Sequence, residues 1–215
     1  MARKPADQSV SRDDILEAAA DVLRRNGYEL TTMKDIAAEV NLTAASLYHH
    51  FRNKDTLLLA VLEIGLEHII SKIEPLVEAE NLPDTKLREM IHAHIVGLTQ
   101  NTAVAAAMVF EISSLLNVKP PHAGASPADK QAYGEYTLRR DAFFTRRDRF
   151  EELFHCVIQG GIQSGVFRPV DVGIFTKALL GAHNWVGVWY REGGRLSGGE
   201  IADLMADTFL RALQV

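Results

Sequence analysis

Helix-start and helix-stop signals recur along the whole chain and constrain its fold more than any other feature. A capping box at Ser11–Asp14 precedes apolar residues at helical spacing, and Asn26-Gly27 ends that segment. Ser126-Pro127 and the capping box at Ser197–Glu200 mark later helix starts. No useful stretch alternates polar and apolar residues as a β-strand would. We therefore predict an all-α fold with roughly two thirds or more of the residues in helices, against about one third in an average protein.

The second and third predicted helices are short, and the others are longer. Asn41 separates the second helix from the third, because asparagine tolerates a left-handed backbone. Pro75 is expected to end the fourth helix, and residues 118–126 form the only proline- and glycine-rich loop of any size. The predicted segments are about 11–26, 32–40, 43–50, 53–73, 84–99, 103–117, 127–164, 171–191 and 198–213.

Composition narrows the class of protein. Hydrophobic residues make up 47% and charged residues 24% of the chain, which is typical of a globular protein in water. No apolar run reaches 18 residues, and the polar N-terminus has no secretory h-region, so we expect a cytoplasmic protein with no membrane span. Cys156 is the only cysteine, which excludes an intramolecular disulfide and a cysteine-based zinc cluster. We expect Cys156 to be buried and the protein to hold no cofactor and no metal.

Residues 32–50 contain two short helices joined by a turn of about three residues, which is the pattern of a helix-turn-helix. Ile36, Leu47 and Phe51 supply the apolar side that packs on the first helix. The outer side of the third helix keeps small and polar side chains that fit the major groove of DNA. Residues 1–55 contain eight Lys/Arg and nine Asp/Glu, so their net charge does not attract phosphate. Any attraction must come from where individual basic side chains lie. The predicted DNA contacts are Thr32, Thr43, Ala44, Ala45, Ser46, Tyr48, His49 and Lys54.

The stretch TTMKDIAAEVNLTAASLYHHFRNKDTLL, residues 31–58, resembles the DNA-binding region of TetR/AcrR-type transcriptional regulators. The shared pattern is Thr-x-x-x-Ile-Ala, then Leu-Tyr-x-His-Phe, then Lys-Asp/Glu-x-Leu, and the likeness covers about residues 11–60. Asn41 stands where the family usually has glycine. The resemblance implies a DNA-binding domain over residues 1–55 and a ligand-binding and dimerisation domain over 56–215. It also implies a dimer, usually a repressor, that sets one recognition helix on each half of a palindromic operator. Arg3 and Lys4 would add DNA contacts or belong to a disordered tail.

The segment from Leu179 to Tyr190 is apolar on nearly every face, so two of its sides must be covered. One side can face the core of the same chain, and a second copy of the segment is the simplest cover for the other. In the resembling family the last two helices form the dimer interface. The residues predicted there are Leu179, Ala182, Val186, Leu204, Thr208 and Phe209.

The resemblance further implies a small-molecule cavity inside the larger domain. For any one candidate for its lining, a plain core residue is the favoured interpretation, and a few polar groups are needed to orient a ligand. His92, His94 and His183 are further polar candidates. The predicted lining is Met108, Glu111, Ile112, Phe143, Phe144, Asn184, Trp185 and Trp189.

The C-terminal part is similar to a subgroup of these regulators that controls fatty-acid and sterol breakdown and senses acyl-CoA thioesters. The similarity rests on Asn184-Trp185, Trp189-Tyr190-Arg191 and the segment 193–197. Residues 139–149 contain five arginines, which either bind CoA phosphates or form a solvated helix face paired with nearby acids. The effector is therefore expected to be an acyl-CoA or another hydrophobic molecule.

A di-metal helical enzyme of the ferritin type is the alternative function. Glu89 with His92 and Glu152 with His155 have the Glu-x-x-His spacing of such sites. With 8 histidines and 15 glutamates in the chain, chance accounts for two such pairs, and a complete site needs two more glutamates from other helices.

Overall fold

Helices make up the whole architecture of the described part of the chain. The structure is a computed structural model that describes residues 10–214, and within this range it holds nine α-helices, one 3-10 helix and no β-strand. The predicted all-α fold is confirmed. The elements are α1 (Arg12–Leu30), α2 (Met33–Glu39), α3 (Ala44–His50), α4 (Lys54–Glu78), α5 (Pro83–Gln100), α6 (Thr102–Phe110), η1 (Ile112–Leu116, 3-10), α7 (Pro127–Gln163), α8 (Val172–Trp189) and α9 (Gly198–Leu213).

Side-chain caps fix where most helices begin. Ser11, Asn53, Ser126 and Ser197 each accept a hydrogen bond from the backbone N–H three residues later, as the capping signals predict. These local hydrogen bonds satisfy donors that the helix itself leaves free. Helix starts are therefore encoded close to the residues that form them.

Three helix boundaries differ from the prediction. The α4 helix continues through Pro75 to Glu78, so the proline does not end it. The segment predicted as 103–117 is divided into α6 and the 3-10 helix η1. Gly27 breaks the α1 geometry with φ 72° and ψ 164°, as its stop signal predicts, but helical turns resume and extend to Leu30.

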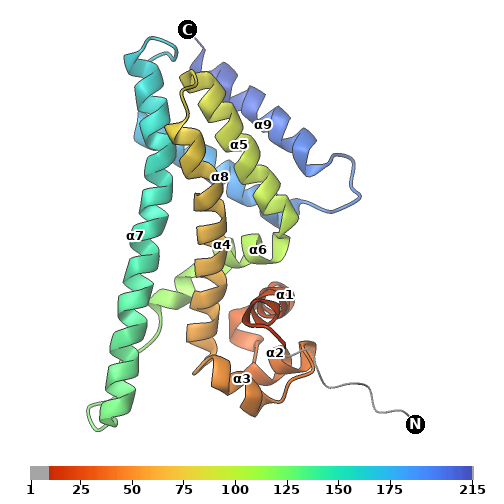
Figure 1. Ribbon diagram of the computed structural model, residues 1–215, viewed down its shortest axis with the longest axis vertical. Coiled ribbons are helices and arrows are strands. Elements are labelled where there is room, and N and C mark those ends of the chain that lie inside the picture. The colour runs from red at the N-terminus through yellow and green to blue at the C-terminus, as the bar shows by residue number, and fades with distance from the viewer. Residues whose placement is uncertain (1–9, 215) are drawn as a thin grey trace.

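Buried apolar side chains form two clusters that share α4. The smaller cluster joins α1, α2 and α3 with Leu57, Ala60 and Val61 from the start of α4. The larger cluster joins the rest of α4 with α5 to α9. In Figure 1 α1, α2 and α3 lie at one end of the molecule, and α4 rises from them between α7 and α5. A movement of α4 would therefore change the packing of both clusters.

Glycines permit two close helix crossings beside α6. A Cβ on Gly187 of α8 would lie 2.5 Å from the Cβ of Ala105, and a Cβ on Gly65 of α4 would lie 2.4 Å from Val104. Both distances are shorter than real carbon contacts, so α6 is held between α4 and α8 at positions that only glycine allows.

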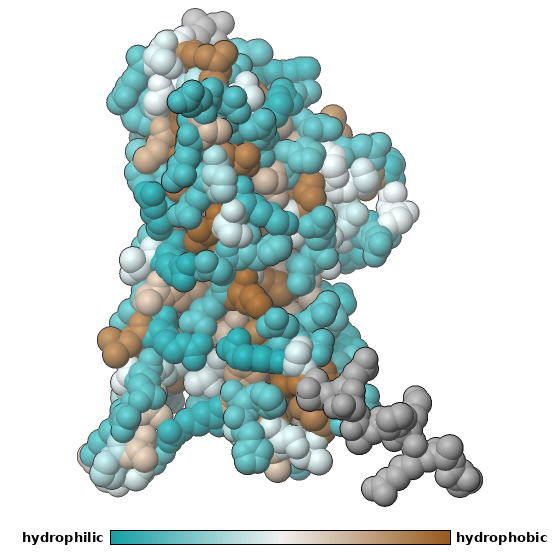
Figure 2. All heavy atoms as spheres, in the orientation of Figure 1, coloured by the Kyte–Doolittle hydropathy of each residue, from teal (hydrophilic) through white to brown (hydrophobic). Residues whose placement is uncertain are grey.

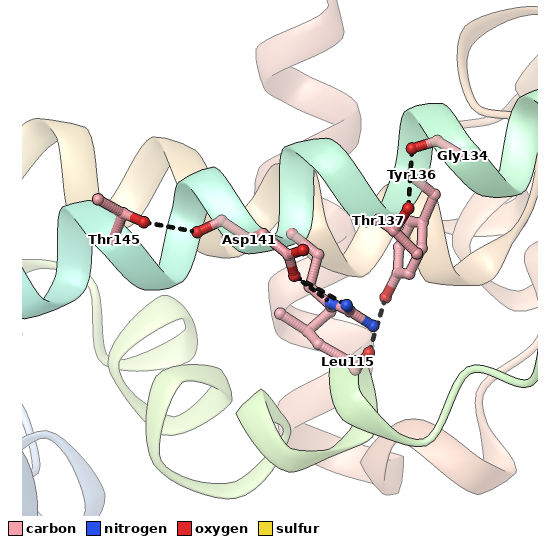
Figure 3. A network of polar contacts seen from close by, with 7 residues as sticks. Leu115, Gly134, Tyr136, Thr137, Asp141 and Thr145 are labelled. Carbon is pink, nitrogen blue, oxygen red and sulfur yellow. Dashed lines mark hydrogen bonds and ion pairs between the residues drawn. The ribbon is translucent and has the colours of Figure 1, made fainter.

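The longest helix, α7, spans almost the full height of the molecule (Figure 1). Figure 3 shows how its N-terminal half is tied to η1, because the Tyr136 hydroxyl donates to the Leu115 carbonyl at 3.2 Å. At its N-terminal end, Asp129 pairs with Arg52, which follows α3, at 2.7 Å. The α7 helix therefore contacts both the segment between α3 and α4 and the larger cluster.

No single helix within residues 10–214 is long and apolar enough to cross a membrane, although α5 and α6 taken together, with a 99° bend between them, reach that length and apolarity. Figure 2 shows mostly hydrophilic side chains on this face, with a hydrophobic band across its middle, at the height where α6 lies above α1.

Candidate DNA-binding surface and ligand cavity

The turn between α2 and α3 has the geometry that the sequence predicts. Thr32 caps α2 and Thr43 caps α3, in each case by accepting a backbone N–H from three residues later. Asn41 adopts a left-handed conformation with φ 57°, and it is the one non-glycine residue with a positive φ among residues 10–214. Leu47 and Phe51 are buried against α1 and α2. The α3 helix is thus packed by one side and free on the other.

The free side of α3 carries most of the residues predicted to contact DNA. Ala45, Tyr48 and His49 are exposed, as are the two capping threonines, while Ala44 and Ser46 are half-buried. The Thr43 and Ser46 hydroxyls lie 2.8 Å apart and share a hydrogen bond. These residues present hydroxyl, methyl and ring groups on a narrow helix surface, which fits the major groove of DNA, about 12 Å wide. Lys34, which was not among the predicted contacts, is exposed on α2 with no ion-pair partner among residues 10–214.

Lys54 lies differently from the other predicted contacts. Its ammonium donates to the Tyr28 carbonyl at 2.6 Å and lies 4.1 Å from the centre of the Tyr28 ring. The Tyr28 hydroxyl in turn donates to Asp55, and burial together with this bond raises the pKa of Tyr28. The expected role of Lys54 as a free phosphate contact is corrected, since the ammonium ties the end of α1 to the start of α4.

Glu111 also belongs to this junction and not to the ligand cavity. A Cβ added to Gly27 at the α1 break would lie 3.8 Å from a Glu111 carboxylate oxygen. Burial raises the pKa of Glu111, while the backbone amide of Tyr28 and the charge of Lys54 oppose that rise. The predicted pocket role of Glu111 is corrected, because the end of α6 aims its side chain at α1.

A cavity of about 640 Å³ opens between α1 and α4 to α8. Of the predicted lining residues, Met108, Ile112 and Asn184 do line it. Most of the interior wall is apolar, and charged residues border the exposed side, which is the common pattern for sites that take small molecules. Most of the α4 and α5 walls were not predicted from the sequence. The lining residues are Asp13, Leu16, Glu17, Ile64, Gly65, Leu66, His68, Ile69, His94, Gly97, Leu98, Gln100, Asn101, Val104, Ala105, Met108, Ile112, Arg147, Phe150, Glu151, Lys177, Leu180, Gly181 and Asn184.

Four aromatic residues predicted for the lining lie elsewhere. Phe143 is buried and packs edge-on against Phe144, with ring centres 5.4 Å apart, away from the cavity. Trp185 and Trp189 are 53% and 48% exposed on the outer side of α8. One residue along a helix turns the side chain by about 100°, so Asn184 faces the cavity while Trp185 does not.

Two histidines from α5 and α8 meet beside the cavity. His94 and His183 are buried, and their Nδ1 atoms lie 3.3 Å apart. Burial lowers the pKa of His94 to about 3, and burial together with the neighbouring His94 lowers the pKa of His183. Both rings are therefore neutral at physiological pH.

These histidines should make the protein less stable in mild acid. An unfolded histidine titrates at a pKa of about 6.5, so the unfolded chain takes up protons below that pH while the folded pair does not. We expect His94 to lower the free energy of unfolding by about 2 kcal/mol between pH 7 and pH 5, and His183 to act in the same direction. Urea unfolding at both values, with a His94→Gln variant alongside, measures this. A variant that lost as much stability in acid as the parent would contradict the assignment.

The five arginines of α7 do not act as one group. Arg139 pairs with Glu63 and Arg146 with Glu67, which joins α7 to α4, and Arg140 pairs with Asp141. Arg147 lines the cavity, and it has no ion-pair partner within 4 Å in the described chain. The interpretation as a solvated helix face paired with acids of the same helix fits Arg140 only, because Arg139 and Arg146 pair with acids of α4. Arg147 is the arginine of this group that lines the cavity.

The outer sides of α8 and α9 carry exposed apolar side chains. Ile174, Trp185, Trp189 and Leu204 are exposed, and Phe110 at the end of α6 contacts the Trp185 ring at 6.2 Å between ring centres. Figure 1 shows that α8 and α9 lie in the upper half of the molecule, away from α3. These exposed apolar side chains make the outer sides of α8 and α9 a candidate interaction surface.

The predicted interface residues divide between this surface and the core. Leu204 and Thr208 are exposed, and Ala182 and Phe209 are half-buried. Leu179 and Val186 have 0% exposure, so they cannot reach a partner, and their assignment to the interface is corrected. The sequence of α8 does not indicate which side faces the core, because apolar residues occur on both sides of the helix.

Three further expectations concern other parts of the chain. Cys156 is exposed and its thiol donates to Glu152, so the expectation that it is buried is wrong. No group of three His, Cys, Asp or Glu residues is placed to share a metal ion in the part of the chain that the structure describes. Arg3 and Lys4 lie outside the described residues.

Comparison with known proteins decides the family. Residues 15–61 match the family model of bacterial regulatory proteins of the tetR family, and residues 137–213 match the tetracyclin repressor-like C-terminal domain. The TetR regulator PfmR from Thermus thermophilus is 31% identical, with 94% of this chain and 98% of that one covered and a TM-score of 0.75. The chain belongs to the TetR family. It is therefore a helix-turn-helix transcriptional regulator and not an enzyme, which removes the di-metal alternative.

Two other relatives of this TetR-family regulator add detail. The transcriptional repressor KstR2 of Mycolicibacterium smegmatis is 25% identical over 199 residues, which is 92% of this chain and 87% of KstR2. A structure of AibR in complex with isovaleryl coenzyme A and operator DNA is 24% identical, covers 94% of this chain and 97% of AibR, and superposes with a TM-score of 0.70. At that identity AibR shows the shared fold.

Proposed function

We propose that this TetR-family regulator is a repressor that binds a palindromic operator as a homodimer and is released by an acyl-CoA. The proposal is carried by one observation, namely that α4 both supports the exposed recognition helix α3 and supplies a wall of the apolar cavity. A ligand that changes the position of α4 would change the placement of α3. Such a regulator works where the DNA is, which is the cytoplasm of a bacterium.

The proposed division of labour follows the two clusters. Residues 1–55 form the DNA-binding domain, and residues 56–215 form the ligand-binding and dimerisation domain, with α4 beginning at the boundary. The proposed DNA contacts are the exposed residues of α3 with Thr32 at the start of α2. The proposed dimer surface is the outer side of α8 and α9, because a second copy of the same apolar surface covers it symmetrically.

An acyl-CoA fits the cavity by polarity. The acyl chain would occupy the apolar interior beside Met108 and Phe150, and the CoA phosphates would meet Arg147, an exposed lining residue. Lys177 is a second exposed cation of the lining, and a phosphate would have to compete for it with Glu151, its ion-pair partner. AibR, which shares the fold, is known in complex with isovaleryl-CoA and operator DNA, and this supports the same effector class here. KstR2 is a transcriptional repressor, and this supports the repressor role here.

Release needs a difference in affinity between two arrangements of the protein. A ligand that binds the non-operator arrangement about 100-fold more tightly supplies about 2.7 kcal/mol per site. The junction of Glu111, Tyr28 and Lys54 lies where such a shift would pass from α6 and α4 to α1. This junction is the proposed route of coupling.

Decanoyl-CoA should release the operator from the parent and not from a cavity-filled variant. Operator duplexes selected from a random library would be followed by fluorescence anisotropy while decanoyl-CoA is added. Met108→Trp fills the cavity, so we expect parental operator affinity and at least about tenfold weaker release. Leu82→Trp, at an exposed site outside the cavity, is the control and should respond like the parent. Release by decanoic acid but not by decanoyl-CoA would contradict the CoA assignment.

A further inference from the structure

One buried polar side chain stands out in the inner wall of the cavity. The other buried lining residues are Leu16, Leu66, Ala105, Phe150 and Leu180, all apolar, and His94 lies among them. The His94 ring packs edge-on against Phe150, with centres 5.1 Å apart, and also contacts Phe154. A ligand that fills the interior must therefore meet this ring or leave it without a partner.

The His94–His183 contact constrains where the protons lie. Two neutral imidazoles whose Nδ1 atoms are 3.3 Å apart can share one proton, so one ring donates and the other accepts. If His94 donated, His183 would carry its proton on Nε2. That atom is buried and has no hydrogen-bond partner in the described chain. A buried N–H without a partner is rarer than a buried acceptor without one.

The favoured arrangement therefore has His183 donating from Nδ1. His183 then leaves a bare, buried Nε2 acceptor, and the centre of its ring lies 5.6 Å from the centre of the Phe209 ring. His94 accepts at Nδ1 and must carry its own proton on Nε2. Unlike the Nε2 of His183, the Nε2 of His94 is not sealed within the protein, and the open space beside this ring is the cavity.

We propose that His94 presents an Nε2–H donor to the bound effector and so selects molecules with a carbonyl-type acceptor oxygen at the inner end of the cavity. His183 is a positioning residue that sets the tautomer of His94. This inference rests on the proposed effector site and makes it more specific. A thioester or ketone carbonyl accepts the hydrogen bond from this donor, whereas a purely hydrocarbon end leaves the donor unpaired. An unpaired donor in an apolar site costs more free energy than a made hydrogen bond contributes.

The proton positions can be measured without any ligand. Long-range proton–nitrogen NMR spectra of the imidazoles distinguish the two tautomers, and His94→Gln and His183→Gln spectra assign the signals. We expect His94 in the Nε2–H form and His183 in the Nδ1–H form. In His183→Leu the Nδ1 of His94 loses its donor, so His94 should become a mixture of tautomers. His94 protonated at Nδ1 in the parent would overturn the inference and leave the proposed function intact.

The fluorescent ketone prodan tests the donor directly, because its emission moves to longer wavelength when its carbonyl accepts a hydrogen bond. We expect saturable binding to the parent. His94→Phe should bind prodan about fivefold more weakly and with emission at shorter wavelength, and His94→Gln, which keeps an N–H, should recover both. Equal binding and equal emission in the parent and His94→Phe would overturn the donor alone. Absence of saturable binding to the parent would overturn the donor and the effector cavity together.

Discussion

Replacing Trp185 with glutamate should leave the chain monomeric and lower its operator affinity by about a thousandfold, because two linked recognition helices gain roughly 10²–10⁴ over one. Trp185 is exposed on the outer side of α8, next to Phe110 and on the same helix as Trp189. In a two-fold dimer one substitution alters the interface twice, since each copy contributes the same surface. The added carboxylates would be buried without partners, which disfavours association strongly.

The measurements separate loss of the dimer from loss of the fold. Sedimentation equilibrium gives the mass, circular dichroism gives the helix content, and anisotropy gives the operator affinity. Leu138→Glu is the matched control, because Leu138 is 73% exposed on α7 and outside the proposed surface. It should stay dimeric and bind DNA like the parent. A dimeric Trp185→Glu variant would show that subunits pair through another surface.

The helix-turn-helix could be predicted because its information is local. Thr32, Thr43 and Asn53 cap their helices within three residues, and Asn41 turns the backbone where its own side chain makes that geometry tolerable. Leu47 and Phe51 then fall on the buried side through helical spacing alone. Each of these features depends on residues close in sequence, so one amino-acid sequence is enough to predict them.

The cavity could be predicted only in part because it depends on how distant helices meet. Met108 of α6 lines it, but Trp185 of α8 faces outward. The α8 sequence does not indicate which of its sides faces the cavity, since apolar residues occur on both sides. Glu111 was placed in the pocket, yet the end of α6 at Phe110 turns it to the α1 break. His94 and His183 are 89 residues apart, so their pairing leaves no local signal.

The two corrected predictions at the N-terminal end share one physical cause. Lys54 and Glu111 were assigned by charge to DNA and ligand, where an unpaired charge is useful. The fold instead brings both to Tyr28 at the end of α1, where a cation meets a carbonyl and a ring. A partly buried charged side chain costs free energy unless it is paired, so such side chains pair with other groups of the protein. The assignment of exposed residues such as Tyr48 is not subject to this competition.

Placing a glutamate at position 45 should lower operator affinity at least about 100-fold while the fold keeps or gains stability. Ala45 is exposed in the first turn of α3, where an acidic side chain favours the helix through its N-terminal dipole. If α3 enters the major groove, the same carboxylate is brought close to phosphates and base edges, where its charge is repelled. Stability and DNA binding would then change in opposite directions, which general misfolding cannot produce.

Ala45→Gln is the control that separates charge from size, since glutamine has nearly the same shape as glutamate and no charge. We expect Ala45→Gln to bind the operator more tightly than Ala45→Glu, and the gap to narrow as salt rises from about 50 to about 200 mM, because repulsion is screened. Ala142→Glu on the exposed side of α7 controls for net charge and should bind like the parent. Parental affinity in Ala45→Glu, measured by anisotropy with an unchanged melting temperature, would mean that this side of α3 does not face the operator. The recognition surface would then have to be sought elsewhere on the three N-terminal helices.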